Sequence, residues 1–139
     1  MNRLEFQKLS NLRRKEALTL LKAKQYEGAY YLVGFAVECA LKACIAKQTN
    51  KHDFPPPQSR VQKVYIHDLK ELMKQAGLEV ILEKEMKINK TLESNWAEVV
   101  PWTVEARYKA SLSGPWVKSF YAACTARKNG LLNWIKRRW

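Results

Sequence analysis

The sequence contains few of the residues that build metal sites, disulfide frameworks or flexible linkers. Its 139 residues include three Cys, two His, five Gly and five Pro. Cys39 and Cys44 are five positions apart in one expected helix and point to different sides of it, so they cannot pair with each other. No Cys, His, Asp and Glu residues cluster at the spacing of metal ligands. These shortages exclude a collagen-like or low-complexity chain and predict reduced, buried thiols, no metal and no cofactor.

The N-terminal segment lacks the apolar core of a signal peptide, because charged residues are spread over residues 1–18. A content of 47% hydrophobic and 27% charged residues is typical of a globular chain and not of a disordered one. A chain of 139 residues suits one domain with its own core. We therefore expect a cytoplasmic protein with a single domain over residues 1–139.

Acidic residues are scarce, and the last quarter of the chain has none. The 13 Asp and Glu against 25 Lys and Arg give a formal net charge of +12, and residues 106–139 contain eight Lys or Arg and no acid. Cations interleaved with Tyr and Trp can hold a phosphate backbone and stack bases. The same cations also suit a solvated helix face that complements the helix dipole. Both interpretations stay open.

Helical periodicity dominates the chain, and no segment alternates polar and β-branched residues as a half-buried strand does. We predict an all-α, up-and-down bundle of four to five helices. The expected helices cover residues 6–24, 27–47, 67–76, 78–92 and the segment from Pro115 onward, which Asn129-Gly130 can interrupt. Residues 48–66, with three consecutive prolines, are an internal connector.

The second expected helix is apolar almost all the way round. Residues 28–46 contain only two charged side chains, Glu38 and Lys42, and come close to the length of a membrane span. Both charges would lie near the middle of that span, where each costs at least ~2.5 kcal/mol. We therefore expect a buried central helix and no membrane. Its small residues would let neighbouring helices approach closely.

Three elements in order carry a resemblance to a known family. The run Tyr26-Glu27-Gly28-Ala29-Tyr30-Tyr31-Leu32-Val33-Gly34-Phe35-Ala36-Val37-Glu38-Cys39-Ala40-Leu41-Lys42-Ala43 resembles the second helix of the HEPN family (higher eukaryotes and prokaryotes nucleotide-binding domain). His67-Asp68-Leu69 and the Trp102-x4-Arg107-Tyr108 element resemble later parts of the same family. The resemblance implies a helical homodimer that is often paired with a minimal nucleotidyltransferase as toxin and antitoxin.

Many members of the family are metal-independent ribonucleases that use an Arg and a His with four to six residues between them in a late helix. No His follows Arg107, so this late-helix motif is absent here. Arg60 and His67 have six residues between them, but in a connector and a helix start. A His with a near-neutral pKa and a permanently charged Arg are what such chemistry needs. Arg60 and His67 are therefore the catalytic candidates, and it stays open whether the chain is an enzyme.

Glu38 is expected to be buried and to need a partner. Lys42 is four residues away, in the order that favours an ion pair, and Arg107 is the long-range candidate. The binding hypothesis places Glu38, His67, Arg107 and Tyr108 around one polar pocket, with Arg107 facing inward. A register-fixing ion pair is the alternative.

Three hypotheses about function follow. The first is a HEPN-like dimeric module that binds a nucleotide, an RNA or a nucleotidyltransferase partner. The second is a metal-independent ribonuclease toxin of a toxin–antitoxin pair, and the third is a purely structural or interaction protein whose basic segment docks on an acidic partner. Self-association is expected in each case, since a small bundle with five Trp, six Tyr and four Phe has many rings to bury.

Overall fold

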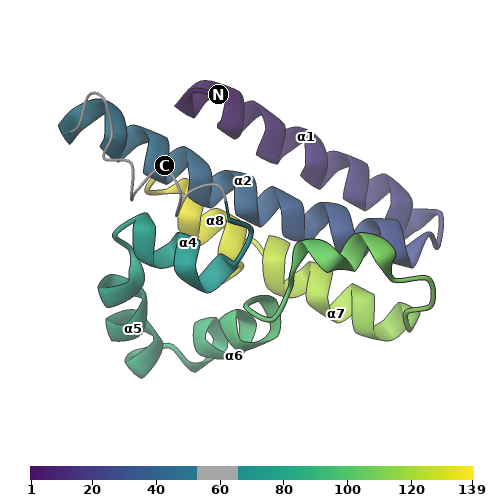
Figure 1. The fold of residues 1–139 in the computed structure, drawn as a ribbon. Helices are drawn as coiled ribbons and strands as arrows, with labels where there is room; N and C mark the ends of the chain where they lie inside the picture. Colours follow the sequence, from purple (N-terminus) through teal and green to yellow (C-terminus); the bar gives the residue numbers. More distant parts are fainter. Residues whose placement is uncertain (53–65) are drawn as a thin grey trace.

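The protein is described by a computed structural model that covers residues 1–52 and 66–139, with side chains placed up to Gln48 and from Ile66 onward. No strand occurs in these two ranges, which confirms the all-α prediction (Figure 1). The elements are α1 (Arg3–Lys22), α2 (Tyr26–His52), α4 (Leu69–Gln75), α5 (Glu79–Ile88), α6 (Lys90–Val99), the 3₁₀ helix η1 (Val104–Tyr108), α7 (Gly114–Thr125) and α8 (Leu131–Lys136).

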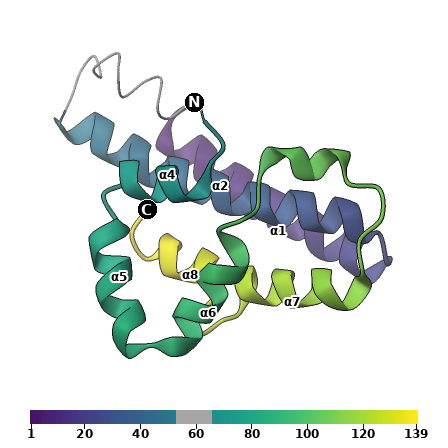
Figure 2. The same cartoon turned by 60° about the horizontal axis from the view of Figure 1, so that its bottom comes forward.

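Helix α2 is the centre of the fold, as predicted from its apolar surface. It packs against α1, α4, α7, α8 and η1, and its residues Ala29, Val33, Ala36, Val37 and Ala40 are all fully buried. Helix α1 lies antiparallel alongside α2, while α4, α5 and α6 lie on the side of α2 away from α1 (Figures 1 and 2). An all-round apolar helix is stable only when several neighbours cover it, and this arrangement supplies them.

Helix α1 begins with a capping box. The side chain of Asn2 accepts a hydrogen bond from the Glu5 backbone N–H, and the Glu5 carboxylate accepts one from the Asn2 N–H, so two of the free donors at the helix start are satisfied. Farther along, the Ser10 hydroxyl is buried and donates to the Ala36 carbonyl over 2.7 Å. This bond fixes the register of α1 on α2.

Two of the predicted helices are each divided in two, so seven α-helices occur in the described ranges where four to five were expected. The segment 78–92 breaks at Asn89, whose side chain accepts from the Leu92 N–H and caps α6. The last helix breaks before Gly130, where Asn129 has a φ of 68°, a conformation that Asn tolerates better than most residues. This second break is the predicted one.

Helix α4 begins and ends where the sequence indicates. Asp68 is its N-cap and accepts from the Glu71 N–H, and Gly77, just beyond the end of the helix, has a φ of 75°. The predicted connector begins later than expected, because α2 continues to His52. The remainder of that segment, with the three prolines, lies outside the described residues.

Part of helix α2, Tyr26–Gln48, is long and apolar enough to cross a membrane by length and composition. Most of that stretch is buried inside the protein. Core helices of soluble proteins share both properties, so the observation does not indicate a membrane span.

Candidate functional site

The candidate site is centred on Glu38, which α2 places in the interior of the protein. Its side chain is fully buried, as predicted. An ionised carboxylate in such a place needs partners that replace water. Two side chains reach it, Lys42 from its own helix and His67 from the segment just before α4.

His67 supplies the closest contact. It directly precedes the N-cap Asp68, so the start of α4 holds its backbone over α2. Its ring nitrogen Nδ1 lies 2.5 Å from Glu38 Oε1, and its side chain is 45% exposed. One edge of the imidazole is therefore bound to the buried carboxylate while part of the ring faces solvent.

Lys42 is the second partner, at the i, i+4 position predicted from the sequence. Its Nζ lies 3.9 Å from Glu38 Oε2, too far for a hydrogen bond. Oε2 has no hydrogen-bond partner among the described residues and is buried. Burial raises the pKa of the Glu38 carboxyl, and the charge of Lys42 and the hydrogen bond from His67 oppose this effect without cancelling it.

This geometry can orient an imidazole for binding or for proton transfer. A carboxylate that accepts from Nδ1–H fixes the ring orientation and leaves Nε2 as the nitrogen that meets a ligand. Nε2 makes no hydrogen bond to the described part of the chain. The arrangement is thus a half-exposed imidazole held by a buried carboxylate, with the Lys42 ammonium close by.

The structure does not bring Arg107 and Tyr108 to this site. The prediction that Arg107 faces inward, toward Glu38 or His67, is wrong. Arg107 is exposed on η1, and its guanidinium lies 4.9 Å from the ring centre of Tyr108, which is 69% exposed. The physical reason is that Ala106 and Trp102 carry the buried face of this segment, so the next residue turns outward and stacks on a neighbouring ring in solvent.

The other candidates from the sequence are Arg60, a metal site and the three cysteines. Arg60 lies outside the described residues. In the described ranges no group of three or more Cys, His, Asp and Glu residues is placed to hold a metal ion. Cys39, Cys44 and Cys124 are free and buried, as predicted. Burial and the neighbouring Glu38 raise the pKa of the Cys39 thiol to about 12, so it cannot act as a nucleophile near neutral pH.

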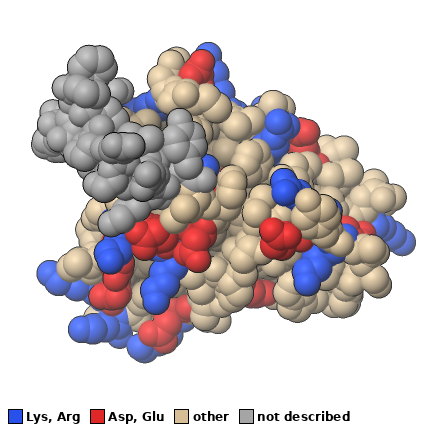
Figure 3. All heavy atoms as spheres, viewed as in Figure 1, with Lys and Arg blue, Asp and Glu red and all other residues tan. Residues whose placement is uncertain are grey.

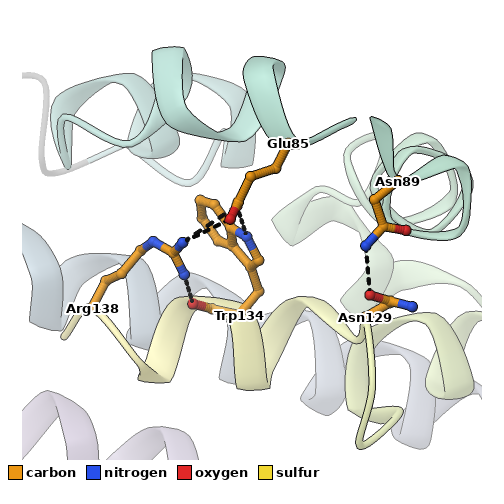
Figure 4. A network of polar contacts seen from close by, with 5 residues as sticks. All are labelled: Glu85, Asn89, Asn129, Trp134 and Arg138. Carbon is orange, nitrogen blue, oxygen red and sulfur yellow. Dashed lines mark hydrogen bonds and ion pairs between the residues drawn. The ribbon is translucent and has the colours of Figure 1, made fainter. Parts of the chain in front are cut away.

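The basic C-terminal segment is only partly neutralised. Glu85 of α5 accepts a hydrogen bond from the Trp134 indole N–H over 2.5 Å and forms an ion pair with Arg138 over 3.3 Å (Figure 4). The guanidinium of Arg138 also lies 3.9 Å from the centre of the Trp134 ring. Asn89 and Asn129 form a second link, over 2.7 Å, between the α5–α6 turn and the α7–α8 turn. These contacts give Arg138 a structural role on α8.

Residues at the junction of α1 and α8 were not singled out from the sequence. Lys136 donates to Asn11 over 2.6 Å, and Arg14 is near enough to affect its charge. The acid-free segment was visible in the sequence, but the helix against which it packs was not. No spacing rule links residues more than a hundred positions apart.

A comparison of the chain with protein-family models, with curated proteins and with solved structures finds no match.

Proposed function

We propose that this chain is a HEPN-like, cytoplasmic, dimeric helical module that binds RNA or a nucleotide through a phosphate contact at His67. The observation that supports it is the Glu38–His67 contact, in which a fully buried carboxylate holds a half-exposed imidazole. When it is protonated on both nitrogens, a ring held in this way presents Nε2–H at a fixed position, as a phosphate oxygen requires. The net charge of +12 favours the approach of an anionic ligand.

The family part of the proposal is supported by the all-helical fold and by the central place of α2. A nucleotidyltransferase partner belongs to the same proposal, and so does a role for Arg107 and Tyr108 as exposed binding residues. Their stacked pair offers a cation and a ring on the surface, which suits a nucleic acid.

A ribonuclease function is the second candidate, and the same contact favours it. In metal-independent cleavage of RNA, the unprotonated Nε2 of His67 would take the proton of a 2′-hydroxyl while that oxygen bonds to phosphorus. The bond from phosphorus to the 5′-oxygen would break, and the 5′-oxygen would take a proton from water. A cation must stabilise the charge on the phosphate. Arg60 stays a prediction for this role.

Fluorescence anisotropy with a labelled single-stranded RNA and with a mononucleotide tests the proposal. We expect His67→Ala to weaken both interactions, and Glu38→Gln to weaken them less because an amide oxygen still accepts from Nδ1–H. Lys84→Ala is the matched control, since Lys84 is an exposed cation of α5, where acidic and basic side chains are interleaved (Figure 3). Equal affinity of His67→Ala and the wild type contradicts the proposal.

Incubation of the RNA with the protein in EDTA separates binding from cleavage. Cleavage that persists in EDTA and disappears in His67→Ala supports the ribonuclease. Intact RNA that is bound through His67 supports a binding module without catalysis.

A further inference from the structure

Side-chain contacts link α1 to the C-terminal end of α8 and the residues that follow it. A guanidinium nitrogen of Arg3 donates to the Trp139 carbonyl over 2.8 Å, and Lys136 donates to Asn11 over 2.6 Å. Lys136 also lies 5.4 Å from the centre of the Trp139 ring. Two segments that are far apart in the sequence therefore build one surface.

This surface gathers cations that have no acidic partner in the described part of the chain. Arg14 and Lys136 are both half-buried, and burial together with the charge of Arg14 lowers the pKa of Lys136. Arg3 and Lys47 both act on the buried thiol of Cys44, whose Sγ lies 3.9 Å from the Ile135 carbonyl of α8. Arg3 and Lys136 thus both contact Trp139, and Arg14 lies about one helical turn from Asn11, the hydrogen-bond partner of Lys136.

None of the ion pairs in the described part of the chain involves Arg3, Arg14, Lys47 or Lys136. Arg138, by contrast, is paired with Glu85. The Nε of Arg3 is buried without a hydrogen-bond partner in the described ranges. Like charges held together and partly withdrawn from water are unfavourable until an anion neutralises them.

The face over α4 and α5 shows the opposite pattern. There Lys and Arg alternate with Asp and Glu (Figure 3), so the cations are compensated locally. Cations without an acidic partner beside an indole are therefore found at the α1–α8 end, and this combination does not follow from the net charge alone.

We propose that Arg3, Arg14, Lys47, Lys136 and Trp139 form an RNA-binding surface, the α1–α8 surface, that takes two or more consecutive backbone phosphates of a single strand and stacks a base on Trp139. Arg14 and Lys136 supply the phosphate contacts, because they are adjacent cations with no acidic partner in the described chain. An indole beside cations can stack a base of a single strand while the cations hold its phosphates, whereas a polyanion without bases gains nothing from the indole. The inference rests on the proposed function for the identity of the ligand and adds that this ligand is a strand and not a mononucleotide.

Anisotropy of a labelled twelve-nucleotide single-stranded RNA, recorded between 50 and 300 mM salt, tests it. The double variant Arg14→Gln/Lys136→Gln should bind more weakly than the wild type, and the slope of log K against log salt should fall in magnitude by about 1.4, since each phosphate of a single strand contributes about 0.7. Trp139→Ala should lower the affinity about tenfold with the slope unchanged. The matched control is Lys84→Gln/Lys87→Gln, which removes two exposed cations of α5 and should leave the slope close to the wild-type value.

Folding is monitored by thermal melting. The removal of the Arg14–Lys136 repulsion should leave the melting temperature of the double variant equal to or above that of the wild type, so a loss of RNA binding is not a loss of fold. An equal fall of the slope in the control pair would mean that only net charge matters, and an unchanged slope in the Arg14/Lys136 variant would mean that the RNA does not touch this surface. Either result overturns the inference.

The outcome also separates this inference from the proposed function. RNA binding that depends on His67 but not on Arg14 and Lys136 supports the His67 site and contradicts the proposal of the α1–α8 surface. RNA binding that depends on Arg14 and Lys136 but not on His67 supports the α1–α8 surface and contradicts the His67 site. If the wild type binds a mononucleotide but no RNA, only the α1–α8 surface is wrong. If it binds neither ligand, both are wrong, and an acidic protein becomes the partner to test.

Discussion

The indole of Trp102 occupies the space in which a side chain at Gly34 would stand. A Cβ built at Gly34 would lie 2.1 Å from Nε1 of Trp102, and Trp102 is almost completely buried. The absence of a side chain on α2 is thus what allows the segment before η1 to close onto the central helix. The expectation that small residues of α2 permit close approach is confirmed at this position.

Gly34→Ala should therefore destabilise the fold. Overpacking of a filled core costs about 1–3 kcal/mol, and the indole cannot shift without disturbing Tyr31, on whose ring it stacks at 6.2 Å. Gly28→Ala is the matched control, because a Cβ there would meet only the flexible end of Leu20, at 3.0 Å. Urea denaturation should show a clear fall in the free energy of unfolding for Gly34→Ala and little change, or a gain of up to ~1 kcal/mol, for Gly28→Ala. Equal effects of the two substitutions would contradict this packing.

The buried carboxyl of Glu38 predicts a pH dependence of stability. Because burial raises its pKa in the folded state, the folded protein holds this proton more tightly than the unfolded chain does. The contribution of protonated Glu38 to the free energy of unfolding is therefore complete when the pH is below the pKa of Glu38 in the unfolded chain. It is lost as the pH rises toward the higher pKa of Glu38 in the folded state, by about 1.4 kcal/mol for each unit between the two pKa values.

Glu38→Gln removes this titration. Urea denaturation between pH 4 and 8 should show the free energy of unfolding of Glu38→Gln rising relative to the wild type as the pH increases. A difference that is flat over the whole range, or that falls with pH, would show that the pKa of Glu38 is not raised.

The three thiols should be unreactive in the folded protein. Burial raises the pKa of Cys39 to about 12 and that of Cys44 to about 11, and it also raises the pKa of Cys124. With a thiol reagent at pH 8 we expect slow labelling that follows unfolding, and three rapidly labelled thiols in denaturant. Rapid labelling of one thiol in the native protein would place it at the surface.

Self-association is expected through exposed aliphatic residues of α5. Val80 and Ile88 are 64% and 88% exposed, and their spacing of eight residues places them on the same side of the helix. Light scattering at tens of micromolar should give a dimer, and Val80→Asp/Ile88→Asp should give a monomer. Leu12→Asp on α1, where Leu12 is 50% exposed, is the control and should remain dimeric. A monomeric wild type at this concentration would contradict the proposal that the protein is a dimer.

Much of the fold could be predicted from local chemistry. The ends of α4 could be predicted from Asp68 and Gly77, because an N-cap and a positive φ each depend on the chemistry of a single residue. The Glu38–Lys42 pair follows from helical spacing alone. Asn89 was missed because it interrupts a segment of continuous helical pattern, and only the cap that it supplies to α6 reveals it.

The site was harder to predict, since it depends on which residues meet across the bundle. His67 and Glu38 could be placed near each other by the order of elements, but their hydrogen bond depends on how α4 sits on α2. Arg107 shows the limit of that argument. Ala106, which precedes it, is buried, while Arg107 and Tyr108 are exposed, because only one side of the short 3₁₀ turn packs on the bundle and successive residues of such a turn point in different directions.

The most direct test of the central claim is the NMR signal of the His67 ring during titration with RNA. The chain has two His residues, so His52→Gln assigns the ring signals of His67 without ambiguity. If His67 contacts phosphate, its ring signals should shift and saturate with the same dissociation constant as the anisotropy titration. RNA binding that leaves the His67 ring signals unchanged would contradict the account.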